Sequence, residues 1–195
     1  MHTERRSSCV LKWRIACRRP VIVDVIRLNL MISRAQAEES ILDCDGSCRD
    51  ITFTAATRVD ASNLVRSLAT QYRVRSANDN RGIERSTQII SGDPFGGIDG
   101  YVHIVFDADS GMIPVFQLFV DHDRATDEHF VEITFFPDDV DRSLFSLDSF
   151  FALVDNWNSV LKSDDYFVRY ENVSWTLNDT DHGGVICSRK NPPAG

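Results

Sequence analysis

The chain has 195 residues, of which 43% are hydrophobic and 10% aromatic. That length suits one domain with a full hydrophobic core and is short for two, and the composition excludes a wholly disordered protein. We therefore predict a single domain over residues 31–190, with a basic extension at 1–30 and a short tail at 191–195.

The net charge of -8 is spread unevenly along the chain. Residues 1–30 carry seven Lys or Arg and two acids, residues 31–91 carry eight of each sign, and residues 92–195 carry nineteen acids and six bases. Phosphate groups are bound by clustered Lys and Arg, so we expect neither a nucleic acid nor a membrane as partner. A negative surface attracts a basic protein instead, although excess Asp also serves simply to keep a small protein soluble.

The N-terminal segment differs in character from the rest. Its apolar run VIVDVI is broken by Asp24, lacks a cleavage site and is too short to cross a bilayer. We expect a cytoplasmic protein, and we hypothesise that translation begins near Met31, where the composition changes, so that residues 1–30 are disordered or not native.

The cysteines are odd in number and scattered, which favours reduced thiols. They are Cys9, Cys17, Cys44, Cys48 and Cys187. Cys44 and Cys48 form a C-x-x-x-C pair, but no second pair or nearby His completes a tetrahedral site, so we assign them to a loop and expect no metal or other cofactor.

The first half of the chain predicts a strand and a helix. Ile51, Phe53 and Ala55 alternate with Thr in a half-buried strand beginning near Arg49. Apolar residues at three- and four-residue spacings then predict a helix capped by Asp60 or Ser62. The stretch SANDNRGIERS is assigned to a loop, and residues 87–90 to a short strand.

The second half predicts a meander, a helix and a hairpin. Strands are expected at 101–106, 113–120 and 130–136, because their connections are short and rich in Asp and Gly. A broad apolar stripe predicts a helix at 147–161. Strands at 166–170 and 173–177 and a last strand at VIC follow, with a frayed end. This order predicts an α+β fold, an antiparallel sheet of about five to seven strands with two main helices packed on one face.

No catalytic motif stands out. The loop after Asp107 lacks the spacing of a calcium site, and neither a nucleophile elbow nor a phosphate cradle is present. His122 and His129 flank an Asp-rich loop over 121–129 and could approach one another. An enzyme that uses this loop, with a bound metal, is therefore an alternative to a binding protein, but we assign no catalytic residue and no metal ligand.

Acidic and aromatic residues occur together in FFPDDVD and in SDDYFVRYENVSW. Strand alternation places Tyr166, Val168 and Tyr170 on one face, so one aromatic row could be exposed beside carboxylates, which would suit the binding of a cationic protein. The alternative, which we favour for any single residue, is that these aromatics cover the helix and belong to the core. The predicted partner-binding residues are Asp138, Asp139, Asp141, Asp164, Asp165, Tyr166, Tyr170 and Glu171.

The segment ITFFPDDVD, the helix containing Asn156 and Trp157, and YFVRYENVSW together resemble immunity proteins of bacterial polymorphic toxin systems. The resemblance covers about residues 130–177. It implies a cytosolic α+β inhibitor that neutralises a cognate basic toxin domain by stoichiometric binding. An adaptor domain in a larger complex is a further alternative, and the sequence leaves the toxin's activity and the oligomeric state open.

Overall fold

The computed structural model describes residues 32–92, 94–98, 100–123, 128–171 and 184–195. Residues 1–30 and the expected strand at 173–177 lie outside these ranges. Among the described residues, no helix is both long and apolar enough to cross a membrane.

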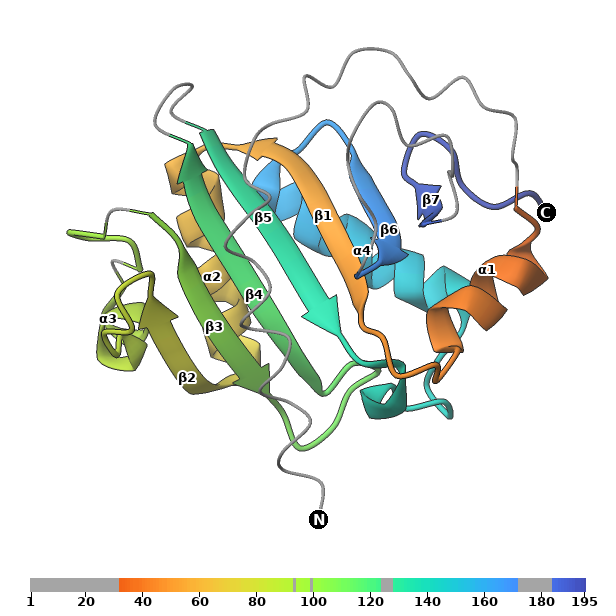
Figure 1. The fold of residues 1–195 in the computed structure, drawn as a ribbon, viewed down its shortest axis with the longest axis horizontal. Helices are drawn as coiled ribbons and strands as arrows, with labels where there is room; N and C mark the ends of the chain where they lie inside the picture. Colours follow the sequence, from red (N-terminus) through yellow and green to blue (C-terminus); the bar gives the residue numbers. More distant parts are fainter. Residues whose placement is uncertain (1–31, 93, 99, 124–127, 172–183) are drawn as a thin grey trace. The chain divides into compact units, whose positions relative to one another are not determined.

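A single antiparallel sheet of seven strands organises the described chain, in the order β2-β3-β4-β5-β1-β6-β7 (Figure 1). The first strand thus lies between β5 and β6, where Ile51 pairs with Ile133 on one side and with Val168 on the other. The strands are β1 (Arg49–Ala56), β2 (Arg73–Asp79), β3 (Val102–Asp107), β4 (Val115–Asp123), β5 (Glu128–Phe135), β6 (Tyr166–Tyr170) and β7 (Val185–Ser188).

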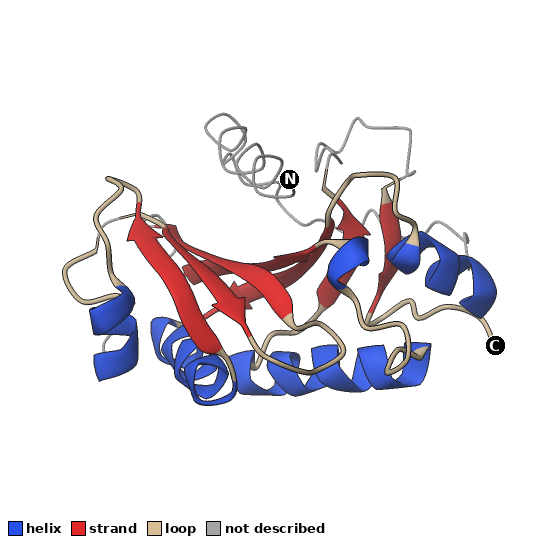
Figure 2. Ribbon diagram, turned by 90° about the horizontal axis from the view of Figure 1, so that it is seen from below, coloured by secondary structure: helices blue, strands red, loops and turns tan. Residues whose placement is uncertain are grey.

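Two main helices, α2 (Arg58–Gln71) and α4 (Leu147–Leu161), cover one face of this sheet (Figure 2). The α+β prediction is therefore confirmed. Helix α4 begins at Ser146, whose side chain accepts a hydrogen bond from the backbone of Ser149. Its buried residues recur at helical spacing, so one stripe faces the sheet. They are Leu147, Phe150, Val154, Trp157, Asn158 and Leu161.

The shorter helices lie at the margins of the sheet. They are α1 (Arg34–Leu42), α3 (Ser86–Ser91) and the 3-10 turn η3 (Pro137–Asp139). Ser33 and Gln36 form a reciprocal capping box at the start of α1, which satisfies two otherwise unpaired backbone donors. Ala37 and Ile41 are the buried residues of this helix, so Glu38, Glu39 and the other side chains between them face outward.

Four local expectations were wrong. Residues 76–79 belong to strand β2 rather than a loop, and residues 87–90 belong to α3 rather than a strand. The cap of α2 is Thr57, whose hydroxyl accepts from the backbone of Asp60. The C-terminal end is not frayed, because Ala194 exchanges backbone hydrogen bonds with Ile32 and Arg34 on either side of Ser33.

Candidate protein-binding surface

Helix α1 and the loop that follows it carry a group of carboxylates on one side of the molecule. Glu38, Glu39, Asp43 and Asp45 are all exposed. They fall within eight residues, and no base lies among them. The helix directs its carboxylates outward because Ala37 and Ile41 occupy the buried side.

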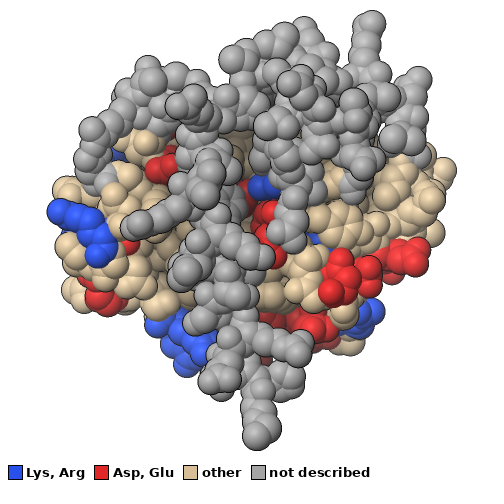
Figure 3. All heavy atoms as spheres, viewed as in Figure 1, with Lys and Arg blue, Asp and Glu red and all other residues tan. Residues whose placement is uncertain are grey.

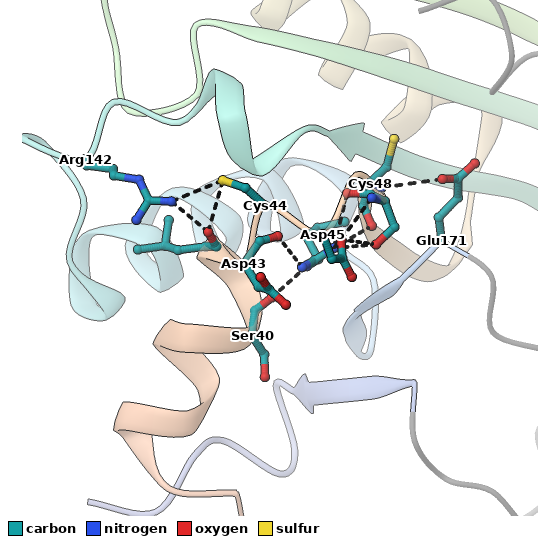
Figure 4. A network of polar contacts seen from close by, with 10 residues as sticks. Ser40, Asp43, Cys44, Asp45, Cys48, Arg142 and Glu171 are labelled. Carbon is teal, nitrogen blue, oxygen red and sulfur yellow. Dashed lines mark hydrogen bonds and ion pairs between the residues drawn. The ribbon is translucent and has the colours of Figure 1, made fainter. Parts of the chain in front are cut away.

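Arg49 holds the loop at residues 43–48 in place from beneath. The side chain is fully buried, and its Nε donates to the carbonyl of Ser40 at 2.7 Å while a terminal nitrogen donates to the carbonyl of Asp43 at 2.7 Å. The other terminal nitrogen contacts Ser47 and Cys48, and the guanidinium lies 4.2 Å from the ring centroid of Tyr170. Figure 4 shows Ser40, Asp43, Asp45 and Cys48 lying close together along this loop. A rigid planar guanidinium suits simultaneous donation to several acceptors.

The turn η3 brings further acids to the same place. Asp138 is exposed, and its carboxylate lies near enough to the Cys44 thiol to raise the pKa of that thiol, while the thiol donates to the carbonyl of Leu42 at 3.5 Å. Arg142 donates to the carbonyl of Leu42 at 2.8 Å and contacts the Cys44 sulfur at 3.2 Å, so it ties the segment after η3 to the end of α1 (Figure 4). An open depression of about 720 Å³ lies between them, lined by Ala35, Glu38, Glu39, Leu42, Asp43, Cys44 and Arg142.

We call the exposed carboxylates of this region the acidic edge, defined as Glu38, Glu39, Asp43, Asp45, Asp138 and Asp141. Figure 3 shows acidic side chains gathered where α1, the following loop and η3 lie in Figure 1. Two members are held in fixed turns. Asp45 accepts two hydrogen bonds from Ser47, and Asp141 accepts two from Ser143. These bonds lower the pKa of both carboxyl groups, so both stay ionised at neutral pH.

The cysteines near this surface are poorly suited to nucleophilic or redox chemistry. The neighbouring carboxylate of Asp138, with burial as a smaller cause, raises the pKa of the exposed Cys44 thiol. Burial raises the pKa of Cys187 to about 12. Reactive cysteines need a stabilised thiolate, and these two environments disfavour one. Among the residues that the structure describes, no disulfide joins Cys44, Cys48 and Cys187, and Cys9 and Cys17 lie outside the described ranges.

Five of the predicted partner-binding residues lie at or beside the acidic edge. Asp138 and Asp141 belong to it, and Asp139 is half-buried next to them. Tyr170 is half-buried and stacks on Arg49. Glu171 is half-buried as well, and its carboxylate accepts from the backbone nitrogen of Cys48 at 3.4 Å, on the other side of the same loop (Figure 4).

The other three predicted residues lie at the opposite end of β6 and do not join this surface. Asp164 is exposed, but Asp165 and Tyr166 are only 5% and 2% exposed. The Asp165 carboxylate accepts from the backbone of Tyr166 and Lys190, and the Tyr166 ring lies 6.1 Å from that of Phe53 in the core. Of the two alternatives, the core one holds for Tyr166 and Val168, because this row of β6 faces the helices, and no exposed aromatic row forms there.

Sequence reasoning missed the α1 half of the acidic edge. Counting charge over all of residues 31–91 concealed this group, because that segment holds eight bases as well as eight acids. A shorter window would have found it, because the run from Glu38 to Asp45 holds four acids and no base.

The two histidines of the 121–129 loop do meet, as expected. His122 and His129 pair across β4 and β5, and their rings stack with centroids 4.7 Å apart. Stacked rings do not direct two nitrogen lone pairs at one point, as a metal would require. Among the residues that the structure describes, no group of three or more His, Cys, Asp or Glu could hold a metal ion. Residues 124–127 lie outside the described ranges.

No family model matches this chain, and no curated protein matches it. Among solved structures, the chain is similar to a chain in the crystal structure of the toxic C-terminal tip of CdiA from Pseudomonas aeruginosa in complex with immune protein. The two chains are 12% identical with a TM-score of 0.45, and the match covers 76% of this chain and 97% of the other. At this identity and TM-score, the likeness carries no conclusion about the activity of this chain.

Proposed function

We propose that the chain is a cytosolic immunity protein, which neutralises a cationic toxin domain by stoichiometric binding through the acidic edge. The observation that carries the proposal is the exposed group of carboxylates around a loop that Arg49 holds from beneath. The resemblance of residues 130–177 to immunity proteins supplies the class of partner.

The geometry supports binding in two ways. A cluster of negatively charged carboxylates accelerates association with a positively charged partner. A loop that is already held in one conformation loses little entropy when a partner docks on it. Asp45 and Asp141 illustrate this second point, since serine hydrogen bonds fix both carboxylates before any partner arrives.

The depression beside Arg142 suits a basic side chain of the partner. Its lining includes the carboxylates of Glu38, Glu39 and Asp43. Cys44 also belongs to the lining, and the carboxylate of Asp138 lies next to the Cys44 thiol. Arg142 is the base in this lining, and it is already engaged with Leu42 and Cys44. An inserted Lys or Arg would therefore meet an excess of negative charge.

The test compares two double variants that change the net charge equally. E38K/E39K reverses two charges of the acidic edge, and D109K/D164K reverses two exposed acids outside it. The partner tested is a toxin domain encoded by a gene neighbouring that of this chain, sought first in the host genome, and association rates are measured at several salt concentrations. We expect E38K/E39K to slow association at least about tenfold and to flatten its salt dependence.

The control variant should bind nearly as fast as the unmodified protein. If no complex forms with the neighbouring toxin domain, the immunity role is wrong. If both variants slow association equally, binding does not use the acidic edge. A growth assay adds an independent readout, because co-expression of the chain should rescue cells that produce the toxin domain.

A further inference from the structure

A second group of charged residues lies inside the molecule, on the face of the sheet opposite to α2 and α4. Asp50 of β1, Glu132 of β5 and Arg169 of β6 come from three adjacent strands. Asp50 and Glu132 are both 0% exposed, and Arg169 is 3% exposed. Two buried carboxylates thus share one buried guanidinium.

The strand register explains why these residues meet. Asp50 pairs directly with Arg169 on one side and with Thr134 on the other. The next pair on the same face of the sheet is Thr52 with Glu132. Residues two apart on a strand share a face, so the two carboxylates lie diagonally across β1 and β5.

The hydrogen bonds divide unequally between the two acids. Glu132 Oε2 accepts from Arg169 and from the Thr52 hydroxyl, each at 2.7 Å, and Arg169 Nε donates to Thr52 at 3.1 Å. Asp50 Oδ1 accepts only from the hydroxyl of Thr134 at 2.7 Å, and its Oδ2 lies 3.4 Å from the Arg169 nitrogen. Glu132 therefore has the better-stabilised negative charge.

Two oxygen atoms in this group accept no hydrogen bond from the residues that the structure describes. They are Asp50 Oδ2 and Glu132 Oε1, and both are buried. If both acids were ionised, the group would carry one uncompensated negative charge out of water, which is strongly unfavourable. A proton on Asp50 Oδ2 removes that charge and turns an unsatisfied acceptor into a donor.

We propose that the folded protein holds one proton in this group, on Asp50. The proton makes the contact between β5, β1 and β6 sensitive to pH, and we call the group of Asp50, Glu132 and Arg169 the clasp. With the proton, the group is neutral overall, because Arg169 balances the Glu132 carboxylate. Without it, the two carboxylates repel one another across the junction. The clasp is independent of the function proposed above.

The electrostatics of the described residues agree with this assignment. Burial, and next the negative charge of Glu132, raise the pKa of Asp50 to about 8, while Arg169 opposes the shift. The charged groups that face Asp50 from the neighbouring strands are Glu132 from β5 and Arg169 from β6, with Glu171 just beyond β6 adding a weaker repulsion. An unfolded Asp titrates near 4, so the two states differ between about pH 4 and about pH 8.

The direction of the pH effect follows from proton binding. Between these pH values the folded state holds a proton that the unfolded state has lost, so stability falls as pH rises. A difference of one full proton changes the unfolding equilibrium constant about tenfold per pH unit. The contribution is fully present below about pH 4 and is lost as pH rises through about 8.

The experiment measures urea unfolding of the intact chain at pH 5, 6, 7 and 8. Asp50→Asn replaces the protonated acid by a neutral group of the same shape, and Asp164→Asn removes an exposed carboxylate as the matched control. We expect the ratio of the unfolding constants of unmodified and Asp50→Asn protein to rise about tenfold per pH unit from pH 5 to 7 and less steeply from pH 7 to 8, where the folded state begins to lose the proton. The Asp164→Asn variant should follow the unmodified protein. Parallel curves for the unmodified and Asp50→Asn proteins would overturn the proposal.

A second measurement uses the unmodified protein and so does not depend on the folding of a variant. Infrared difference spectroscopy detects the carbonyl stretch of a protonated carboxylic acid. We expect one such band at pH 6 that disappears as the pH passes through about 8. Absence of the band at pH 6 would also overturn the proposal.

Discussion

Replacement of Arg49 by methionine is predicted to destabilise the protein strongly while leaving its surface charge pattern almost unchanged. Methionine keeps much of the apolar stem that packs beside Tyr170, but it removes every hydrogen bond of the guanidinium. The carbonyl oxygens of Ser40 and Asp43 then lose their 2.7 Å donors. Hydrogen bonds from a charged group contribute about 1.5–3 kcal/mol each, so two of them amount to about 3–6 kcal/mol.

We expect the lower half of that range, about 3–4 kcal/mol, because Asp43 is exposed and water can replace part of what its carbonyl loses. The assay is urea unfolding at neutral pH. Hydrogen exchange should report faster opening of residues 43–48, since the buried anchor of that loop is gone.

Arg66→Met is the matched control. Arg66 also donates to a backbone carbonyl, that of Gly92, at 2.9 and 2.6 Å, but it is exposed. Water can take its place, so we expect a loss of no more than about 1 kcal/mol. Equal losses for the two variants, or a loss below about 1 kcal/mol for Arg49→Met, would refute the view that Arg49 holds the acidic loop.

Two further predictions concern the core and the thiol of Cys44. Phe150→Ala should lower the free energy of unfolding by about 3–5 kcal/mol, because its ring is fully buried between Phe135, Phe145 and Phe151. The same change at the half-buried Phe151 should lower it less. A larger loss for Phe151→Ala than for Phe150→Ala would contradict this packing. Asp138→Asn should speed alkylation of Cys44 at pH 8, followed by mass spectrometry of its peptide, because loss of the neighbouring carboxylate lets the raised pKa of the thiol fall. An unchanged rate would mean that Asp138 does not set the state of this thiol.

Elements with a strong local pattern were predictable from the sequence. Helix α4 occupies residues 147–161 as expected, because its apolar stripe and its Ser146 cap are both local features. The position of β1 between β5 and β6 was not predictable in this way. Strand pairing of that kind joins residues far apart in the chain, and periodicity carries no information about it.

The two misassigned segments show where local pattern fails. Strand β2 has the sequence RVRSAND, in which Ala77 is the buried apolar residue. It is an edge strand, so few of its side chains need be apolar. Helix α3 is only six residues long, and Ile89 and Ile90 gave it the appearance of a strand, although Ile90 is 70% exposed.

Only part of the acidic edge was predictable from the sequence, because burial and pairing decide which charges reach the surface. Counting charges along the sequence assumes that every acid and base contributes to the surface, and several do not. Glu132 and Asp165 are buried, which reduces the negative field expected from the C-terminal half. In the apparently balanced segment 31–91, the base within α1, Arg34, is paired with Asp148, and the other bases lie outside this helix. Arg49 is buried, Arg73 pairs with Asp107 at 2.7 Å, and Arg85 pairs with Asp79 at 2.7 Å.

The charge that a partner meets is therefore set by burial and pairing more than by the total of -8. At the acidic edge, the carboxylates are exposed, while Arg49 lies beneath the loop and Arg142 is already engaged. Exposed charges act on an approaching molecule through water and are weakened by salt, whereas buried ones act mainly on their neighbours. For a cationic partner steered to this protein, substitutions of Glu38 and Glu39 should therefore change the salt dependence of association. Substitutions of the buried Asp50 and Glu132 should leave that salt dependence almost unchanged.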